Sequence, residues 1–383
     1  MDSTTDTSTI DQPGDGAKEA PLLSPPIAAA KVASERTIDG AAAGDDPDRG
    51  RSKDRHSMSS SHSGSIHSQP TSILMPAEVP REPTGSTIIE PDSVFDDSGR
   101  SFHGYKEGKY FLPNDAAEQD RLDLQHAMLM MATGGKLAHA PMDHDPEYVM
   151  DVATGTGIWA IQFGTVTRPA AQEHPGSHVI GTDLSKIQPA LPMVQNCEFV
   201  KDDAEEEWLY RTPETGSAGK VLFDYVHLRM VFTCFADNLV VMRHAFDNMR
   251  PGGWIEYCDL YIDPLSRTGR HEGSTVQKFW ATFRKGMSKI GRDMLCPRNY
   301  KAWLAESSTS KSKSTTAPSP TGRRTPSQKR LGQYALVNLT EGARGFSWKA
   351  LGFAGLSADE KETLIAELRR DAGDPSLEIF HPV

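Results

Sequence analysis

The feature of this 383-residue chain that most restricts its fold is a glycine-rich turn between a strand pattern and an apolar helix. The strand pattern is Tyr148–Val152, the turn reads Asp151-Val152-Ala153-Thr154-Gly155-Thr156-Gly157, and the helix is expected from Ile158. Gly155 and Gly157 allow a sharp turn and a close approach to a ligand, and the following helix offers its free amides. This order of elements predicts a nucleotide-binding site of the Rossmann type.

Four further apolar segments of strand length follow the turn, and helical patterns separate them. These segments are His178–Thr182, Cys197–Val200, Leu222–Val226 and Trp254–Tyr257. Strands that alternate with helices imply right-handed crossovers, so the fold class expected is α/β with a doubly wound, mostly parallel sheet. Helices are also predicted over five ranges: Asp237–Met249, Thr275–Gly291, Tyr300–Ala305, Leu331–Gly342 and Ala358–Arg370.

Composition divides the chain into four parts. No Phe, Tyr or Trp precedes Phe95, and residues 1–98 are rich in Ser, Thr, Asp, Pro, Ala and Gly, so this part is predicted to be a disordered tail. Residues 99–306 are expected to form the ligand-binding domain. Residues 307–330 are a second low-complexity stretch, predicted to be a disordered Ser/Lys/Pro-rich insertion, and residues 331–383 return as helical parts of the same domain.

Charge and cysteine content narrow the classes of partner. A formal net charge of −11 and a pI near 5.6 argue against chain-wide affinity for nucleic acid. The four cysteines form no CxxC pair, which favours neither a disulfide framework nor a metal site. No apolar run approaches the ~20 residues of a membrane helix, and the N-terminus lacks a signal or transit pattern. We therefore expect a soluble intracellular protein, in the nucleus or the cytoplasm, with no membrane partner.

Acidic residues stand where the second and third strand patterns end. Asp183, followed by Leu184, is placed to accept hydrogen bonds from both hydroxyls of a ribose. Asp203-Ala204 suits the edge of an adenine, the carboxylate taking the exocyclic amine and a backbone amide reaching a ring nitrogen. Asp202 is the alternative acid at that position.

Two cofactor classes fit the glycine turn. Gly155 to Ala160 also matches G-x-G-x-x-A, the pattern of NAD(P) enzymes. The acid pair after the third strand and Pro251-Gly252-Gly253 before the fifth belong instead to the arrangement of methyl-donor enzymes. Together these features favour S-adenosyl-L-methionine as the cofactor, with a methyl acceptor as the second ligand.

Candidate residues for the acceptor end follow the fourth strand pattern. His227 is predicted at the mouth of the site as a general base, and Arg229 as the anchor of an anionic substrate; for His227 a structural hydrogen bond at the strand end is the alternative. Tyr110 and Trp159 either line the cofactor mouth or serve packing. No Asn/Asp-Pro-Pro-aromatic signature stands here, which argues against a DNA methyltransferase, and no metal site is expected.

Six strings in order make the chain similar to a known family, the fungal LaeA-like methyltransferases, which include the velvet-complex regulator and trans-aconitate-type enzymes. The strings are HGYKEGKYFLPNDAAEQDRLDLQH, VMDVATGTGIWAIQF, VIGTDLSKIQP, DDAEEEW, FDYVHLRM and MRPGGWIEY. The resemblance implies a Rossmann-like methyltransferase fold and S-adenosyl-L-methionine. For the regulator itself it implies a nuclear role in secondary metabolism, with regulatory protein partners.

The chain departs from that family pattern in ways that leave two functions open. Ala153 stands where the family usually has Gly, and the antiparallel hairpin that ends the family's sheet is expected to be missing, which leaves the fifth strand as an exposed edge. One hypothesis is an active methyltransferase with a small-molecule or protein acceptor. The other is a catalytically weak, cofactor-binding regulatory module that acts through protein partners.

Overall fold

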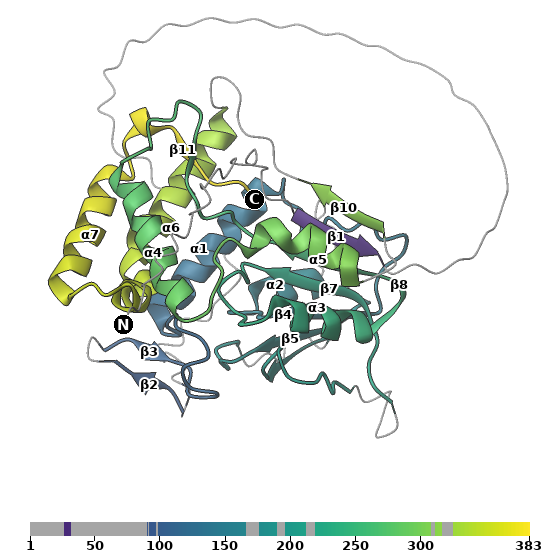
Figure 1. The fold of residues 1–383 in the computed structure, drawn as a ribbon. Coiled ribbons are helices and arrows are strands. Elements are labelled where there is room, and N and C mark those ends of the chain that lie inside the picture. The colour runs from purple at the N-terminus through teal and green to yellow at the C-terminus, as the bar shows by residue number, and fades with distance from the viewer. Residues whose placement is uncertain are drawn as a thin grey trace, which may run out of the picture.

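The computed structural model describes residues 27–31, 90, 92–96, 99–165, 176–189, 196–211, 219–307, 311–315 and 325–383. A seven-stranded sheet lies at the centre, and a group of helices stands beside it (Figure 1). Most of the tail predicted over residues 1–98, and much of the insertion predicted over residues 307–330, lies outside the described residues.

Five parallel strands form the body of the sheet, as predicted. They are β4 (Tyr148–Val152), β5 (His178–Asp183), β6 (Cys197–Lys201), β7 (Phe223–Arg229) and β8 (Met249–Cys258). Their order across the sheet is β8-β7-β4-β5-β6, so the chain reverses direction of winding at β4. The α/β doubly wound class is therefore confirmed, and the glycine turn after β4 lies at the switch point where such sheets bind ligands.

Two strands are longer than the sequence patterns predicted. β7 runs on to Arg229, so His227 lies within the strand and not after it. β8 begins at Met249, so Pro251-Gly252-Gly253 lies inside its first half. The apolar run of β7 breaks at His227, which conceals its length in the sequence, although His227 and Leu228 are both buried in the strand.

The edge of the sheet beyond β8 differs from the expectation. The backbone of β1 (Ile27–Lys31) pairs antiparallel with β8, and β10 (Lys311–Thr315) pairs antiparallel with β1. The C-terminal strand, β11 (Ile379–Phe380), pairs with β9 (Leu265–Ser266) in a separate two-stranded sheet. The prediction of an exposed β8 edge is therefore wrong, because an extended segment from a low-complexity stretch pairs with the backbone of β8. Backbone pairing needs no apolar sequence pattern, so the sequence did not reveal this strand.

Seven helices complete the described part of the chain, and none of them is long and apolar enough to cross a membrane. They are α1 (Ala116–Ala132), α2 (Ile158–Gly164), α3 (Asn238–Asp247), α4 (Thr275–Lys289), α5 (Tyr300–Ser307), α6 (Pro326–Ala354) and α7 (Ala358–Asp371). α6 starts inside the stretch predicted as insertion, because Thr325 and Gln328 form a capping box there. The other short elements are β2 (Val94–Phe95), β3 (Ser101–Phe102) and two 3-10 turns, Cys296–Asn299 and Pro375–Leu377.

Helices α4, α6 and α7 pack on one another and form a cap beside the sheet, with α1 between cap and sheet (Figure 1). The cap has its own apolar core, which includes Val276, Phe279, Leu351 and Leu364. Burial of such side chains contributes roughly 1.5–3 kcal/mol each. The main core of the sheet also includes Phe283 and Met287 of α4 and Ala350 of α6, so cap and sheet are packed against each other.

Side chains alternate between the two faces of the sheet. Val226 and Leu228 of β7 join the core beneath α3 and α5, whereas Tyr225 and His227 point to the opposite face, where Trp159 of α2 packs on both rings. By the same alternation Arg229 follows His227 onto the face of α1 and α2. This alternation decides which of the predicted residues reach the site.

Candidate functional site

A cavity of about 920 Å³ lies at the carboxyl ends of the parallel strands, between the sheet, α1 and the helical cap. Ligand sites in open α/β sheets are found at this position. Nine residues predicted from the sequence line the cavity. They are Tyr110, Ala153, Gly155, Asp183, Leu184, Asp202, Asp203, Ala204 and Arg229.

The glycine turn forms one wall of the cavity. Ala153 and Gly155 both have left-handed backbones, with φ of +56° and +60°, and the amide of Gly155 donates to Asp183 Oδ2 at 2.9 Å. Thr156 Oγ1 donates to Asp123 Oδ1 of α1 at 2.8 Å, which ties the turn to that helix. A left-handed conformation suits glycine and costs an alanine roughly 1–2 kcal/mol, so the turn holds its shape against a strain at Ala153.

Asp183 closes β5 and faces the cavity. Its two carboxylate oxygens accept from the backbone amides of Gly155 and Ser185, both at 2.9 Å. The surrounding protein removes the carboxyl group from bulk water, and this desolvation raises its pKa to about 6. Each carboxylate oxygen has a second lone pair, so the held carboxylate is still able to accept from a pair of ligand hydroxyls.

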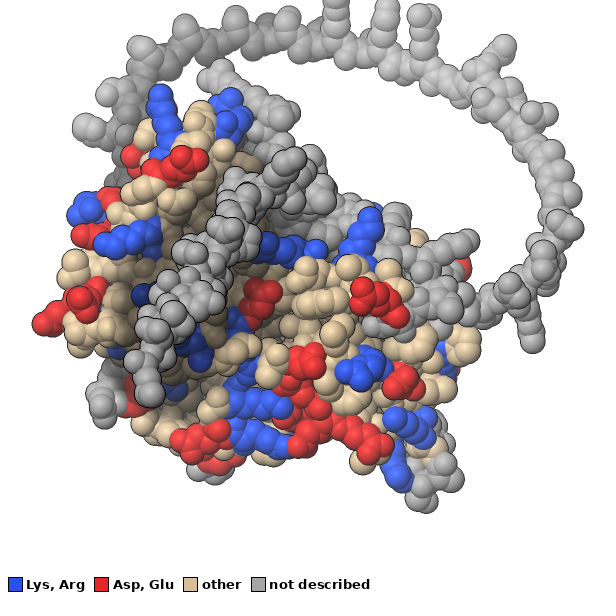
Figure 2. Space-filling model, viewed as in Figure 1, with Lys and Arg blue, Asp and Glu red and all other residues tan. Residues whose placement is uncertain are grey.

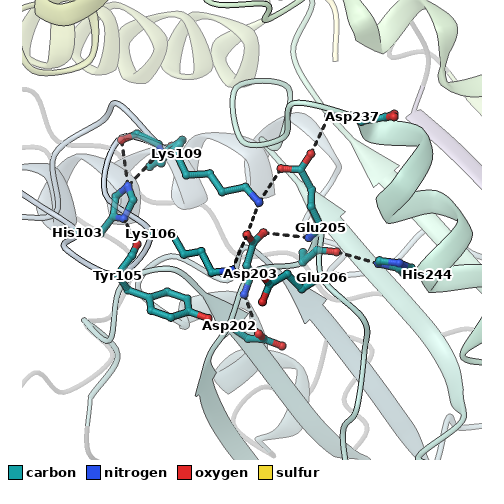
Figure 3. Close-up of polar contacts among 12 residues, drawn as sticks. His103, Tyr105, Lys106, Lys109, Asp202, Asp203, Glu205, Glu206, Asp237 and His244 are labelled. Atoms are coloured by element: carbon teal, nitrogen blue, oxygen red, sulfur yellow. Dashed lines mark hydrogen bonds and ion pairs between the residues drawn. The ribbon is translucent and has the colours of Figure 1, made fainter.

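The acids that follow β6 are tied into a network of charges (Figure 3). Asp203 accepts from the ammonium of Lys109 and from the amide of Glu205 at 3.0 Å, and Lys106 Nζ lies 4.0 Å from the same carboxylate. Asp202 is engaged differently, since its oxygens accept from the amide of Asp203 and from the hydroxyl of Tyr210. Both acids line the cavity, but Asp203 is ion-paired with a lysine, whereas Asp202 accepts from a tyrosine hydroxyl.

Lys106 and Lys109 belong to the segment His103–Tyr110, which crosses over this end of the cavity. The ring of His103 braces the segment, because its Nδ1 lies 2.7 Å from the carbonyl oxygen of Tyr105 and its Nε2 lies 3.0 Å from that of Tyr110. On the face of the molecule shown in Figure 2, acidic and basic side chains lie next to one another over the sheet domain. The segment is thus fastened by opposite charges above a wall of the predicted adenine site.

His227 does not lie at the mouth of the site, which corrects the prediction from the sequence. Its side chain is buried, its Nδ1 lies 2.8 Å from Asp151 Oδ1, and its ring stacks on Trp159 with the ring centres 3.6 Å apart. Burial lowers the pKa of the imidazole. His227 does not line the cavity, so the alternative, a structural hydrogen bond, describes its place in the fold.

Three further predicted residues support the cavity from below. Asp151 is buried and accepts from His227 and, at 2.5 Å, from Thr154 Oγ1. Trp159 is buried on the opposite side of the turn, where its Nε1 donates to the carbonyl oxygen of Leu137. Gly157 caps α2, and a Cβ there would lie 2.5 Å from Phe199 Cζ. Trp159 therefore serves packing, and all three residues shape the turn from outside the cavity lining.

Arg229 reaches the cavity from the end of β7. Its Nη2 lies 2.7 Å from Nδ1 of His126 on α1, and His126 Nε2 lies 3.0 Å from Gln162 Oε1. Burial and the guanidinium lower the pKa of His126 to about 3, so this histidine is neutral. Burial also lowers the pKa of Arg229. Guanidinium groups pair with carboxylates and phosphates through parallel hydrogen bonds.

The structure also reveals residues that the sequence patterns did not single out. Asp259, just after β8, is buried and accepts from the Val231 amide at 2.7 Å and the Tyr300 hydroxyl at 2.6 Å. It thereby holds the turn after β7, in which Met230 has a φ of +59° and lines the cavity. The only signal for Asp259 in the sequence is an acid after a strand pattern, which is too common to identify a site.

Comparison with known proteins places the chain among methyltransferases. Residues 124–300 match the family described as "Methyltransferase domain". Methyltransferase pytC of Aspergillus terreus is 32% identical over 256 residues, which cover 65% of this chain and 73% of pytC. Residues 124–300 contain the glycine turn, the strand-end acids and Arg229.

The chain also matches laeA proteins, over a smaller share of their length. The protein-methionine methyltransferase laeA of Emericella nidulans is 30% identical over 212 residues, 55% of this chain and 52% of laeA. The secondary metabolism regulator laeA of Monascus pilosus is 29% identical over 55% of this chain and 54% of its own length. The chain thus spans about half of each laeA protein. Among solved structures, a phosphoethanolamine N-methyltransferase of Haemonchus contortus with bound S-adenosyl-L-methionine has a TM-score of 0.35 and 16% identity, over 68% of this chain and 50% of the other.

Proposed function

The chain belongs to the LaeA-like family of fungal methyltransferases, and from this premise we propose that its cavity binds S-adenosyl-L-methionine and directs the methyl group to a small-molecule or protein acceptor. The observation that carries the proposal is the convergence of the glycine turn, Asp183 and Asp203 on one cavity at the switch point of the sheet. When bound, the cofactor supplies an electrophilic methyl group on a sulfonium.

The residues that line the cavity divide into roles toward this cofactor. Asp183 is assigned to the two ribose hydroxyls, with Leu184 beside it, because both of its oxygens are held by amides and retain free lone pairs. Asp203 and Ala204 are assigned to the adenine edge, and Asp202 positions Asp203 by accepting from its amide. Ala153, Gly155 and Tyr110 line the remainder of the cofactor part, while Asp151, Gly157 and Trp159 hold the turn in shape.

Positioning is the main catalytic contribution that we propose for this chain. In-line transfer needs the methyl donor and the acceptor atom held in one line. Proximity and orientation alone lower the activation free energy by about 7–11 kcal/mol. Among the titratable side chains of the described cavity lining, His126 has both ring nitrogens engaged, by Arg229 and Gln162, and Glu118 is paired with Arg121. His227 is shielded by Asp151 and Trp159. None of His126, Glu118 and His227 is therefore assigned as a general base, and Arg229 is assigned to orient an anionic acceptor.

A regulatory function is the second candidate, and two observations favour it. The laeA relative of Monascus pilosus is named a secondary metabolism regulator, and the strained Ala153 stands in the turn that faces the cavity. In this alternative the cavity binds the cofactor, but the protein acts through protein partners, in the nucleus as the family resemblance implies. Cofactor binding without methylation of any small molecule or protein of the producing cell would support it.

Titration calorimetry with S-adenosylmethionine and S-adenosylhomocysteine tests the cofactor assignment. We expect one-to-one binding of both compounds and none of NAD. Asp183→Asn should weaken binding roughly tenfold to a hundredfold, since a hydrogen bond to a charged group contributes about 1.5–3 kcal/mol. Asp359→Asn, in the exposed first turn of α7, is the matched control and should bind like the wild type. Binding of NAD in place of the methyl donor would overturn the assignment.

A further inference from the structure

The cavity has a second part that the cofactor residues do not account for. Its walls come from the segment after β8, from α4 and from α6, and apolar side chains of these elements line much of it: Leu260, Ile262, Trp280, Phe283, Leu339 and Phe346. Polar residues of α6, such as Gln333 and Asn338, also line the cavity. Cofactor and drug-sized ligand sites have volumes of about 300–1,000 Å³. At about 920 Å³ this cavity lies near the upper end of that range, and its lining extends from the strand-end acids to the helices of the cap.

Arg229 lies at the boundary between the two parts. β7 is flanked by β4, which carries the cofactor turn, and by β8, whose chain continues into Leu260 and Ile262. The guanidinium at the end of β7 is thus placed between the glycine turn and the apolar walls.

Within the described residues no carboxylate forms an ion pair with Arg229. The two nearby acids that act on it electrostatically, Asp151 and Glu256, are engaged elsewhere. Asp151 accepts from His227 and Thr154, and Glu256 accepts from the amides of His139 and Ala140 at 2.8 and 2.7 Å. Arg229 is partly buried, and its contact with the neutral ring of His126 does not balance its charge. An uncompensated charge away from bulk water is costly, so a ligand anion would complete this part of the cavity.

We propose that this second part is the acceptor site and that the acceptor is an amphipathic small molecule, with one anionic group on Arg229 and an apolar body among the side chains of α4, α6 and the segment after β8. The proposal rests on the proposed function, because it places the acceptor beside the cofactor. It favours a small molecule over a protein side chain, since the walls enclose a body larger than one side chain and present aromatic rings such as Trp280, Phe283 and Phe346 to it.

Binding of straight-chain carboxylates tests the proposal without knowledge of the acceptor. Hexanoate, octanoate and decanoate are titrated into the full chain, with and without saturating S-adenosylhomocysteine, and octanamide serves as the uncharged counterpart of octanoate. We expect one saturable site whose affinity rises about fourfold per added methylene, the value for full burial of a CH₂ group. Octanamide should bind at least tenfold more weakly than octanoate.

Two variants separate the two halves of the proposal. Arg229→Met should abolish the preference for octanoate over octanamide and leave the affinity for S-adenosylhomocysteine within about twofold. Leu260→Asn should reduce the gain per methylene to less than about twofold. Leu209→Asn is the matched control, because Leu209 is exposed and lies outside the cavity lining, and it should behave like the wild type.

Three outcomes decide the matter. If no carboxylate binds while S-adenosylhomocysteine does, the acceptor proposal is overturned and the cofactor assignment stands. If Arg229→Met weakens S-adenosylhomocysteine as much as octanoate, the guanidinium holds the methionine carboxylate of the cofactor, which also overturns the proposal. Carboxylate binding with no S-adenosylhomocysteine binding would show an anion site with apolar walls but overturn the cofactor assignment, and with it the role of that site as the acceptor site.

Discussion

At the scale of single residues, Ala153 occupies a backbone conformation that its side chain disfavours. Its φ of +56° is left-handed, which costs a residue with a Cβ roughly 1–2 kcal/mol. Ala153→Gly removes that strain but adds about 0.5–1 kcal/mol of backbone entropy to the unfolded chain. We expect a net gain of about 0.5–1 kcal/mol in the free energy of unfolding, measured by urea denaturation.

A matched substitution checks that the gain comes from the left-handed backbone. Ala302→Gly replaces an exposed alanine inside α5, where the backbone is right-handed and helical. That change should destabilise the protein by about 0.8–1 kcal/mol. Equal effects at both positions would show that Ala153 is not strained.

Asp183 predicts a pH dependence of cofactor binding with a definite sign. Burial raises the pKa of its carboxyl from 3.8 to about 6, and nearby His103 and Glu90 act in opposite directions on it. Ribose hydroxyls donate to the charged form and so favour it. The affinity for S-adenosylhomocysteine should therefore rise as pH increases from 5 to 7, by up to about tenfold per unit below pH 6, and then level off.

The contribution of Asp183 to the free energy of unfolding should fall as pH rises, opposite to its effect on cofactor affinity. Its pKa in the folded state lies above the ordinary value, so the folded chain holds the extra proton between about pH 4 and 6, and this contribution falls as pH rises through that window. Titration calorimetry with S-adenosylhomocysteine at four pH values measures the pH dependence of binding. Asp183→Asn should remove its slope, and a slope that persists in the variant would show that Asp183 is not its source.

At the scale of elements, the segment His103–Tyr110 is fastened to the end of β6 by charge. The side chain of Asp203 is 4% exposed and pairs with Lys109, whose side chain is 25% exposed. Lys109→Met leaves a buried carboxylate whose nearest replacement cation is Lys106, at 4.0 Å. We expect a loss of about 1–3 kcal/mol in the free energy of unfolding, measured by urea denaturation.

Lys106 should make the effect of the two lysines non-additive. In Lys109→Met the second ammonium is close enough to move toward Asp203, so the double variant Lys106→Met/Lys109→Met should lose more than the two single losses combined. Lys109→Arg keeps the charge and should lose little. A double variant that equals the sum of the singles would show that Lys106 takes no part in holding the segment.

The elements also show how far local sequence patterns reach. β4, β5 and α4 follow from apolar periodicity, and the site residues of the glycine turn and Asp183 follow from their order along the chain. The pair Lys109 and Asp203 could not be predicted in this way, because 94 positions separate them. His227 was misplaced for a related reason: its orientation depends on how far β7 extends, and the polar residues that end β7 obscure that length. Pairing of β1 with β8 depends on backbone hydrogen bonds, which leave no side-chain pattern to find.

At the scale of the whole molecule, the fit between the cap and the sheet domain decides whether the cavity has its second part. Helices α4 and α6 meet at Gly286, where a Cβ would lie 1.8 Å from the carbonyl oxygen of Ala350. Gly286→Ala therefore forces the two helices apart. The strand-end acids and the glycine turn lie on the sheet domain, so the same change should leave the cofactor part of the cavity intact.

We expect Gly286→Ala to lower the free energy of unfolding by about 1–3 kcal/mol, the usual cost of overpacking, even though alanine is the better helix former by about 1 kcal/mol. Hydrogen exchange should accelerate in α4 and α6 but not in β4 and β5. The affinity for octanoate should fall, and the affinity for S-adenosylhomocysteine should stay unchanged. Gly176→Ala is the control, because a Cβ there has no neighbour within 4 Å, and it should be neutral or slightly stabilising. If Gly286→Ala proves as stable as the wild type, the cap is loosely packed and its walls are too yielding to select an acceptor by shape.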